Sequence, residues 1–327
     1  MKVEIFRRTV KDRKRGNSYE LLYHLKKGIE SEGDEAIIVN EKRSGPTVDG
    51  EMTPTAPMAA MFGYGGDKQM HHTKGRRREL ANNCRAKKIP LITFDGGLLS
   101  SFGNVSTSSD HHFRVSLYTP MNDGDFLSDN SPGDRWEMLV KKFNVKYEPW
   151  RKSNQDDPII FVMQPKDNWS MNELDPIDWF NGVYEKLRPA TGRKFIVRPH
   201  PNNVSNIVDR ENELPDDVEI QYSQKHFKGD EKKYYRFNFQ DAIANAHAVV
   251  THNSTASVDS CIRGIPTFCT SDLALCWDVC NKDLNDIEAP KTPDRTQWVH
   301  DLGYKLWSIK EIKDGTVYKR FKSKLGL

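Results

Sequence analysis

The chain contains 327 residues with a formal net charge of +3, and 36% of the residues are hydrophobic and 29% charged. These proportions are typical of a globular protein with room for two domains of ordinary size. No apolar run approaches the roughly 20 residues of a membrane-spanning helix, and residues 1–6 predict a strand where a signal peptide would stand. We therefore expect a cytoplasmic, monomeric protein without a membrane span.

The first predicted elements are a strand at 2–6, a helix at 19–31 and a strand at 36–39. Between the first strand and the helix lies a loop with Lys11, Arg13, Lys14 and Arg15. Arg76 belongs to a second basic segment, the predicted helix 72–87. Residues 1–90 carry 19 Lys and Arg against 12 Asp and Glu, whereas the rest of the chain is slightly negative. This imbalance predicts a polyanionic partner for the N-terminal part, and a merely solvated basic face is the alternative.

Further predicted elements of the first half are a loop at 40–57, a strand at 58–62, a strand at 89–94, a strand at 113–118 and a helix at 134–143. The strand 89–94 ends at Asp95, which Gly96 and Gly97 follow. An acidic residue at a strand end is a candidate catalytic group when glycines without side chains follow it and leave room beside its carboxylate. A turn-forming or helix-capping aspartate is the alternative.

Residues 144–157 predict a linker, so the chain divides into a domain at 1–150 and a domain at 151–327. The second domain has predicted strands at 159–163, 195–197, 248–250 and 265–268 and predicted helices at 179–187, 239–246 and 256–263. The tail from residue 287 has helical spacing. Lys166 follows the first of these strands and is a candidate phosphate ligand, although a single loop lysine is more often only solvated.

Two polar stretches follow strands of this second domain. Arg198-Pro199-His200-Pro201 places a forked cationic donor and a histidine in extended backbone, because each proline disfavours the α region for the residue before it. The stretch Thr251–Thr255 opens the helix 256–263, and helix N-termini attract phosphates. Gly264 stands where a helix C-terminal glycine belongs. An ordinary capped helix and a proline-stiffened loop are the alternatives.

Together these two stretches resemble the C-terminal half of GT-B glycosyltransferases, clearest over residues 158–272 and closest to capsule-type and phage-encoded sugar transferases. The resemblance implies an α/β fold of two Rossmann-like domains that face each other across a cleft. It implies that the 151–327 domain binds a nucleotide-sugar, with a UDP-sugar as the expected donor, and that the 1–150 domain binds the acceptor. The C-terminal helix of such enzymes often crosses back to the first domain.

The resemblance also implies donor-binding roles within the second domain. The residues concerned are Arg198, His200, Asn253, Ser254, Thr255 and, near the donor ribose, Asp259, with Lys166 as a further candidate. These groups would neutralise the donor diphosphate, so no metal and no other cofactor is expected. Asp95 would act as general base if the reaction inverts the anomeric configuration.

The acceptor that the basic N-terminal residues favour is DNA with hydroxymethylated pyrimidines, as for phage-encoded transferases of this fold. Three alternatives stay open: a capsule or cell-surface polysaccharide transferase, a polyol-phosphate transferase, and a non-enzymatic nucleotide or nucleic-acid binding module. The five cysteines are Cys84, Cys261, Cys269, Cys276 and Cys280. Since Cys276-x-x-x-Cys280 lacks a second ligand pair in the sequence, we expect reduced thiols and no bound metal.

Overall fold

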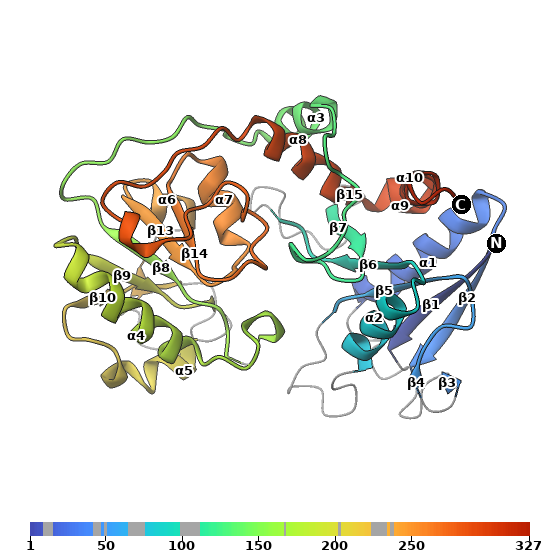
Figure 1. Cartoon of the computed structure of the whole chain (residues 1–327), viewed down its shortest axis with the longest axis horizontal. Helices are drawn as coiled ribbons and strands as arrows, with labels where there is room; N and C mark the ends of the chain where they lie inside the picture. Colours follow the sequence, from blue (N-terminus) through green and yellow to red (C-terminus); the bar gives the residue numbers. More distant parts are fainter. Residues whose placement is uncertain are drawn as a thin grey trace. The chain divides into compact units, whose positions relative to one another are not determined.

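The computed structural model describes residues 1–8, 16–41, 47–48, 51–64, 76–98, 112–166, 168–201, 204–223, 234–235 and 239–327. The chain divides into two compact units. Unit 1 consists of Met1–Asn144 and Val299–Leu327, and unit 2 of Val145–Trp298 (Figure 1). Among the described residues, no helix is both long and apolar enough to cross a membrane.

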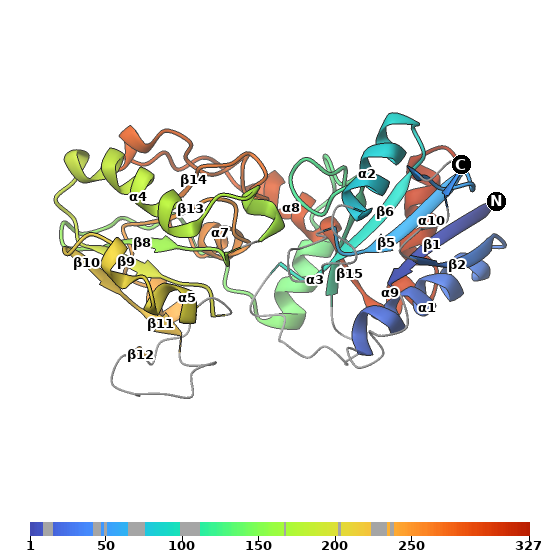
Figure 2. The ribbon, with the colours of Figure 1, turned by 90° about the horizontal axis from the view of Figure 1, so that it is seen from below.

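Unit 1 is built on a sheet with the strand order β15-β7-β6-β5-β1-β2. Strands β2, β1, β5 and β6 run parallel and lie side by side in Figure 2, whereas β7 and β15 are antiparallel to their neighbours. Its elements are β1 (Lys2–Arg8), α1 (Gly16–Ser31), β2 (Glu35–Glu41), β3 (Thr47–Val48), β4 (Glu51–Met52), β5 (Met58–Phe62), α2 (Arg76–Ala86), β6 (Leu91–Asp95), β7 (His112–Leu117), α3 (Asp134–Phe143), most of α8 (Thr296–Lys305), β15 (Leu306–Ser308), α9 (Ile309–Lys313) and α10 (Thr316–Lys324). The first three residues of α8 belong to unit 2.

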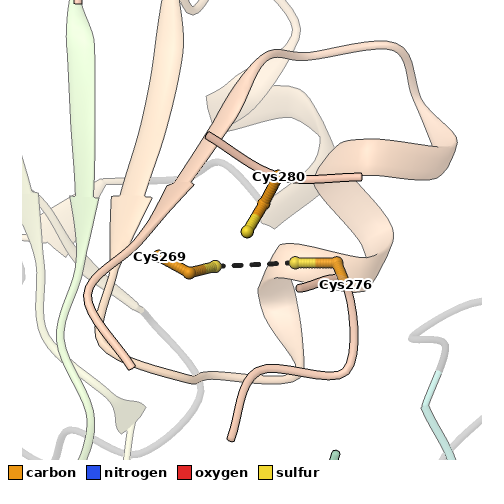
Figure 3. Close-up of side chains that lie close together, drawn as sticks. All are labelled: Cys269, Cys276 and Cys280. Carbon is orange, nitrogen blue, oxygen red and sulfur yellow. Dashed lines mark hydrogen bonds between the residues drawn. The ribbon is translucent and has the colours of Figure 1, made fainter. Parts of the chain in front are cut away.

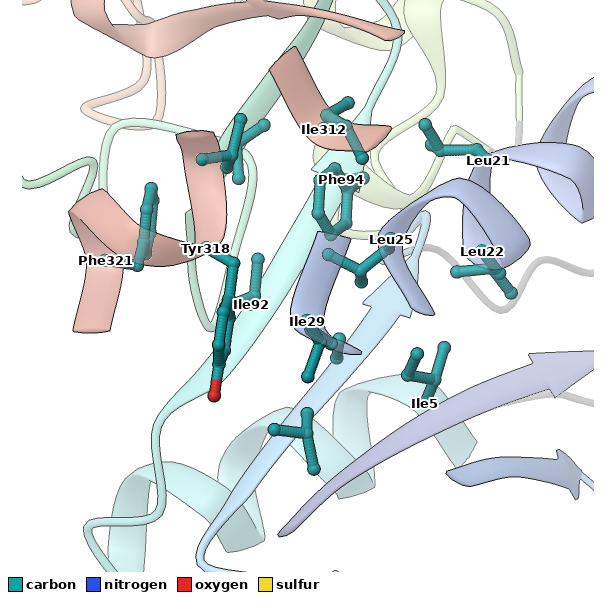
Figure 4. Close-up of a cluster of buried hydrophobic side chains, with 14 of the residues drawn as sticks. Ile5, Leu21, Leu22, Leu25, Ile29, Ile92, Phe94, Ile312, Tyr318 and Phe321 are labelled. Carbon is teal, nitrogen blue, oxygen red and sulfur yellow. The ribbon is translucent and has the colours of Figure 1, made fainter. Parts of the chain in front are cut away.

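Alternating side chains along the strands of unit 1 supply two apolar faces, because successive residues of a strand point to opposite sides. One face packs against α1, α9 and α10, where Leu25, Ile29, Ile312, Tyr318 and Phe321 are fully buried (Figure 4). The opposite face packs against α2. The core of unit 1 therefore contains residues from both ends of its discontinuous sequence.

Charged contacts fix the C-terminal segment within unit 1. The Arg135 guanidinium of α3 donates to both carboxylate oxygens of Glu311 and lies 3.9 Å from the centre of the Trp307 ring. Glu311 in turn forms a capping box with Ser308 at the start of α9. On α10, Tyr318 donates to Asp34 at 2.7 Å. Residues 299–327 thus complete both the sheet and the helical layer of unit 1.

Unit 2 contains a five-stranded parallel sheet with the order β10-β9-β8-β13-β14. The chain runs outward from β8 to β9 and β10, then returns to β13 on the other side of β8. Its helices and strands are β8 (Ile159–Val162), a 3-10 helix (Trp169–Met171), α4 (Pro176–Leu187), a 3-10 helix (Arg188–Ala190), β9 (Phe195–Arg198), α5 (Val204–Val208), a 3-10 helix (Glu211–Glu213), β10 (Val218–Ile220), β11 (Tyr222–Ser223), β12 (Tyr234–Tyr235), α6 (Phe239–Ile243), β13 (Ala248–Thr251), α7 (Ala256–Ile262), β14 (Thr267–Cys269) and a 3-10 helix (Leu284–Asp286).

The two faces of the unit 2 sheet are covered by different helices. Phe161 and Val250 pack with side chains of α4 and α5 on one face, whereas Ile160 and Val249 pack with Ile243 of α6 on the other. A parallel sheet with apolar residues on both faces and helices over each is the Rossmann arrangement. The sequence predicted all four strands that form its centre and one edge to within two residues.

Two parts of the sequence prediction were wrong in detail. The segment 40–57, expected as a loop, contains the short antiparallel pair β3 and β4. The tail, expected to be helical throughout, contains β15, whose Trp307 pairs with Phe113 of β7. The spacing of Leu306 and Trp307 from residues 298 and 302 fits one face of a helix. These two residues form a strand instead, because they pair with β7 and extend the sheet of unit 1.

Candidate functional site

The carboxyl ends of four strands of unit 2 lie in one row. Arg198 of β9 stands opposite Val162 of β8, Val162 opposite Thr251 of β13, and Thr251 opposite Cys269 of β14. The chain leaves β8 toward β9 on one side and returns to β13 on the other, so the sheet reverses its winding between β8 and β13. Ligands of open α/β sheets bind outside the strand ends at such a reversal.

Polar side chains that follow β8 and β13 form a buried hydrogen-bond network at this reversal. Gln164 donates to the Asn253 side-chain oxygen at 2.7 Å and accepts from the Asn253 backbone N–H at 3.0 Å. Ser170 joins both, because its hydroxyl accepts from Gln164 at 2.8 Å and donates to Asn253 at 2.9 Å. The Asn253 amide also donates to the Ser170 carbonyl at 2.8 Å. All three side chains are buried.

This network gives Asn253 a positioning role. Its side chain is 1% exposed and hydrogen-bonds to two other loops of the strand-end edge. The second of these loops is the one after β14, where the Asn253 amide donates to the Ser271 hydroxyl at 3.3 Å, and Gln164 and Ser170 both belong to the loop after β8. Asn253 therefore fixes the backbone that presents Ser254 and Thr255, both half-buried. Sequence analysis selected Asn253 but missed Gln164 and Ser170. The only local signal for Gln164 was its place before Pro165 just after β8, and Ser170 had no such signal.

Arg198 ends β9 with its side chain 7% exposed. Its guanidinium donates to the Gln221 side chain at 3.1 Å. Burial lowers the pKa of the Arg198 guanidinium from its usual value, but an arginine so shifted still carries its charge at neutral pH. His200 follows two residues later and is half-buried. The structure thus places a buried cation next to the end of β8.

His252, the first residue after β13, was not selected from the sequence. Its Nδ1 lies 2.8 Å from the Thr270 hydroxyl, which also accepts from the Trp179 indole N–H at 2.8 Å. Because Thr270 accepts from Trp179, its own hydroxyl proton is available to His252 Nδ1, which favours the neutral tautomer with the proton on Nε2. Burial lowers the pKa of His252, although Asp272 opposes this shift. His252 is therefore a neutral N–H donor at neutral pH.

Of the remaining donor-site candidates of unit 2, Lys166 is exposed and Asp259 is buried. The Lys166 ammonium is exposed and lies 3.5 Å from the Asp175 carboxylate, which caps the N-terminus of α4. Asp259 is 8% exposed within α7. Gly264, predicted to end this helix, has a φ of +71°, and a Cβ there would collide with the carbonyl oxygen of Pro149. Only glycine therefore fits at the end of α7.

In unit 1, Asp95 ends β6 and forms an ion pair with Arg114 of β7. The Arg114 guanidinium lies 2.9 Å from one carboxylate oxygen of Asp95, and the Gly96 backbone N–H donates to the other at 2.8 Å. Arg114 is 6% exposed and also donates to the carbonyls of Gly96 and Pro120. The Asp95 side chain keeps 27% of its surface exposed. Its carboxylate is thus fixed in orientation and accessible.

The predicted acceptor-binding residues Lys11, Arg13, Lys14 and Arg15 lie outside the described residues. Arg76 is the first residue of α2. The neighbouring Arg77, part of the same basic segment, is only 3% exposed and donates to the carbonyl oxygens of Phe62 and Gly63 at the end of β5. Arg77 therefore stabilises the end of β5 in unit 1 and is not a surface cation.

One pocket of unit 2, with a volume of about 350 Å³, lies away from the strand-end row. All of its lining residues except Glu288 precede β8 or β9, so the pocket is located at the amino ends of these strands. Arg193 and Glu288 in its wall form an ion pair at 3.1 Å. The carboxyl-end row, where the buried polar network lies, remains the candidate site of unit 2.

No protein-family model matches the sequence, and no curated protein matches it. Among solved structures, the chain resembles the KpsC β-Kdo 2,4-transferase of Thermosulfurimonas dismutans, with a TM-score of 0.54 and 16% identity over 97% of this chain and 98% of that one. The KpsC β-Kdo 2,7-transferase of the same organism gives a TM-score of 0.47 and 10% identity over 98% and 100%. The UDP-GlcNAc 2-epimerase of Methanocaldococcus jannaschii gives 0.29 and 12% over 85% and 87%.

The first of these likenesses extends over nearly the whole of both chains and bears on the fold. The fold class is GT-B. Both Rossmann-like units that the sequence predicted are present, each with parallel strands at the centre of its sheet. Activity, donor and acceptor do not follow from a likeness at 16% identity and are argued separately from the residues.

Proposed function

We propose that this protein is a glycosyltransferase that moves a sugar from a nucleotide-sugar to a hydroxyl group of a capsule or cell-surface carbohydrate. The observation that carries the proposal is the row of strand ends in unit 2. There a buried arginine ends β9, and a neutral histidine and two hydroxyl-bearing residues follow β13, with β8 lying between these two strands. This set offers hydrogen-bond donors and one fixed positive charge to an anion above the sheet.

The donor diphosphate is the anion that fits these groups. Arg198 supplies the charge, and His200, His252, Ser254 and Thr255 supply hydrogen bonds. Asp259 is the candidate for the donor ribose, and Lys166 can add charge if it leaves Asp175. Stabilisation of the departing nucleotide diphosphate by these preorganised donors lowers the barrier to transfer without a metal ion at the diphosphate.

Asp95 is the candidate general base for the acceptor hydroxyl. Its exposed carboxylate, oriented by Arg114 and Gly96, suits the abstraction of a proton from a bound alcohol. A retaining reaction does not need this base. The likeness to the KpsC β-Kdo 2,4-transferase supports a carbohydrate acceptor and adds Kdo to the sugars worth testing.

Duplex DNA with hydroxymethylated pyrimidines is the second candidate acceptor. The observation that favours it is the charge of residues 1–90, which include Lys11, Arg13, Lys14, Arg15 and Arg76. Phosphate contacts by such residues would make DNA binding fall steeply as salt rises, with a log–log slope of about −0.9 per contact. The carbohydrate acceptor ranks first because the fold likeness is to a Kdo transferase.

The test begins with thermal shifts for a panel of UDP-, GDP- and CMP-sugars that includes a nucleotide-linked Kdo. The donor that stabilises the protein is then incubated with oligosaccharide acceptors and, separately, with hydroxymethylated duplex DNA, and products are read by mass spectrometry. Sugar on the oligosaccharide supports the first proposal, and sugar on DNA replaces it by the second. Hydrolysis or binding of every donor with no transfer to either acceptor contradicts both.

A further inference from the structure

All four cysteines of unit 2 gather at one place, although they are spread over 20 residues and three segments. Cys261 lies on α7, Cys269 ends β14, and Cys276 and Cys280 follow in the next loop. The sulfur atoms of Cys269, Cys276 and Cys280 all lie within 4.8 Å of one another, and their side chains point toward a common centre (Figure 3). The fifth cysteine, Cys84, lies in unit 1.

The spacing of the three sulfur atoms matches the corners of a tetrahedral thiolate site. Zinc–sulfur bonds of about 2.3 Å place the ligands of a tetrahedron roughly 3.8 Å apart. The Cys269 and Cys276 sulfur atoms are 3.5 Å apart, and the other pairs fall within 4.8 Å. Changes of up to about 1 Å in these separations would therefore bring all three sulfur atoms to bonding distance from one metal ion.

The backbone holds two of these ligands in the geometry common to metal sites. The Cys280 N–H donates to the Cys276 carbonyl at 2.9 Å, so the two residues stand on one helical turn and present their thiols on the same side. The Cys269 N–H donates to the Asn281 carbonyl at 3.0 Å, which ties β14 to the end of this turn. The Cys261 thiol contacts Cys276 but lies outside the group of three sulfur atoms that are within 4.8 Å of one another, so it would move closer to become the fourth ligand.

The charges around the cluster suit a metal–thiolate group. Three thiolates around a divalent ion carry a net charge of −1, and four carry −2. The Arg295 guanidinium donates to the Cys261 carbonyl and is 4% exposed. The Lys282 ammonium lies over the Trp277 ring, beside Cys280. Both cations also have other partners in the protein, since Arg295 donates to the Glu148 carbonyl as well and Lys282 lies over an aromatic ring.

We propose that Cys269, Cys276 and Cys280, with Cys261 as the fourth ligand, bind one zinc ion that fastens the segment 269–281 to α7. Binding exchanges each thiol proton for a bond to the metal, so one proton leaves per coordinated cysteine and no redox change occurs. Soft thiolate ligands favour zinc over magnesium or calcium. Sequence analysis expected no metal because Cys276 and Cys280 lacked a second pair, and the fold supplies that pair from β14 and α7.

The site is distinct from the donor diphosphate contacts in the proposed function and does not depend on them. It lies directly beneath them, because Thr270 and Ser271, the residues after Cys269, contact His252 and Asn253. The metal would therefore act as a structural support for the strand-end row.

The test uses the full chain, purified under reducing conditions after growth with added zinc. Elemental analysis is expected to find about one zinc per chain in the wild type and in the control Cys84→Ser, whose cysteine is equally buried but isolated in unit 1. Cys280→Ser, which alters the least buried ligand and is the variant most certain to fold, should lose most of the zinc. Cys269→Ser and Cys276→Ser should do the same.

Cobalt(II) provides a readout that does not depend on variants. The wild type, freed of zinc by a chelator and titrated with cobalt(II), should develop sulfur-to-cobalt charge-transfer absorption and the intense visible bands of tetrahedral coordination. Cys261→Ser should lower the charge-transfer intensity by about a quarter, since it removes one of four thiolates. Removal of zinc should lower the melting temperature by about 10 °C, since a ligand far above its Kd stabilises the folded state strongly.

Two results would overturn the proposal. One is a wild-type protein with five titratable thiols, no zinc and no cobalt spectrum after reconstitution, which would make the cluster an apolar thiol core. The other is a disulfide between two of these cysteines in protein kept under reducing conditions, which would make it a redox pair.

Discussion

Arg198 is the residue whose chemistry most directly links the fold to the proposed reaction. It is a buried cation at a strand end, and its guanidinium donates to the neutral side chain of Gln221. The removal of a charge-assisted phosphate contact costs about 1.5–3 kcal/mol. Arg198→Ala should therefore weaken nucleotide-sugar binding by roughly tenfold or more, measured by calorimetry with the donor that the thermal screen selects.

The matched control for this prediction is Arg263→Ala. Arg263 belongs to the same unit but caps the opposite end of α7, where it pairs with Glu148 at 3.6 Å. The Arg263→Ala substitution should leave the affinity for the nucleotide-sugar unchanged. Equal loss of affinity in both variants, or normal affinity in a folded Arg198→Ala protein, would argue against a diphosphate at the strand-end row.

Asp95 poses a different problem, because its variant affects both chemistry and packing. Asp95→Asn should lower transfer by roughly 10²-fold or more if the carboxylate is the general base. It also weakens the partner of the buried Arg114, so a loss of unfolding free energy of about 1–3 kcal/mol is expected as well. Kinetics must therefore be measured on protein shown to be folded, at a temperature well below its melting transition.

Two outcomes separate the roles of Asp95. A fall in kcat at unchanged donor affinity, in fully folded protein, supports the base. A variant whose lost activity follows its lost folded fraction, and recovers when the protein is stabilised by donor, assigns Asp95 to the structure of unit 1 alone.

At the scale of elements, the loops after β8 and β13 are stabilised by each other. Asn253→Ala deletes an acceptor and a donor from the buried network with Gln164 and Ser170 and leaves their groups unsatisfied. The expected cost is about 2–3 kcal/mol of unfolding free energy, measured by urea denaturation. The double variant Gln164→Ala with Asn253→Ala should lose clearly less than the sum of the single variants.

Asn181→Ala is a suitable control for that cycle. Asn181 lies on α4 of the same unit, away from the network, and donates to the Glu213 carbonyl at 2.9 Å. Its effect should add to that of Gln164→Ala. Additivity of Gln164→Ala and Asn253→Ala themselves would mean that the two loops are held independently.

The elements also show what a sequence can and cannot predict. The strands β8, β9, β13 and β14 were found because strands buried on both faces are continuous apolar runs. Their order, and with it the row at their carboxyl ends, followed only from the resemblance to a known fold. Ser170 could not be assigned to Asn253, because 83 residues separate them and only the register of β8 and β13 brings them together.

At the scale of the molecule, buried histidines make stability depend on pH. His247 is 2% exposed and donates from Nε2 to the Ile287 carbonyl, and its pKa is lowered chiefly by burial. Burial lowers the pKa of His252 and His24 too. A histidine of the unfolded chain is protonated near pH 6.5, whereas in the folded protein it stays neutral to a lower pH. The stability that the neutral form contributes is therefore fully present above pH 6.5 and is lost as the pH falls from there toward the folded pKa.

Urea denaturation at pH 7.5 and 5.5 should therefore show a lower unfolding free energy at the acidic pH, with at most about 1.4 kcal/mol from His247, the limit for one pH unit below the unfolded pKa. Carboxylates do not explain a loss in this range, because their pKa values lie lower. His247→Gln should be less stable at pH 7.5 and less sensitive to pH. A wild type equally stable at both pH values would mean that these histidines are protonated in the folded state.

The discontinuity of unit 1 matters most while the protein is being synthesised. Ile312, Tyr318 and Phe321 reach the ribosome exit only after all of Val145–Trp298, and at about 5–20 residues per second this delay is roughly 8–30 s. During this interval the apolar side of α1 and the outer edge of β7 are uncovered, whereas unit 2 is contiguous and can fold at once. The nascent chain thus holds a finished unit 2 and an unfinished unit 1, and the exposed surface of unit 1 is where chaperones would be expected to bind.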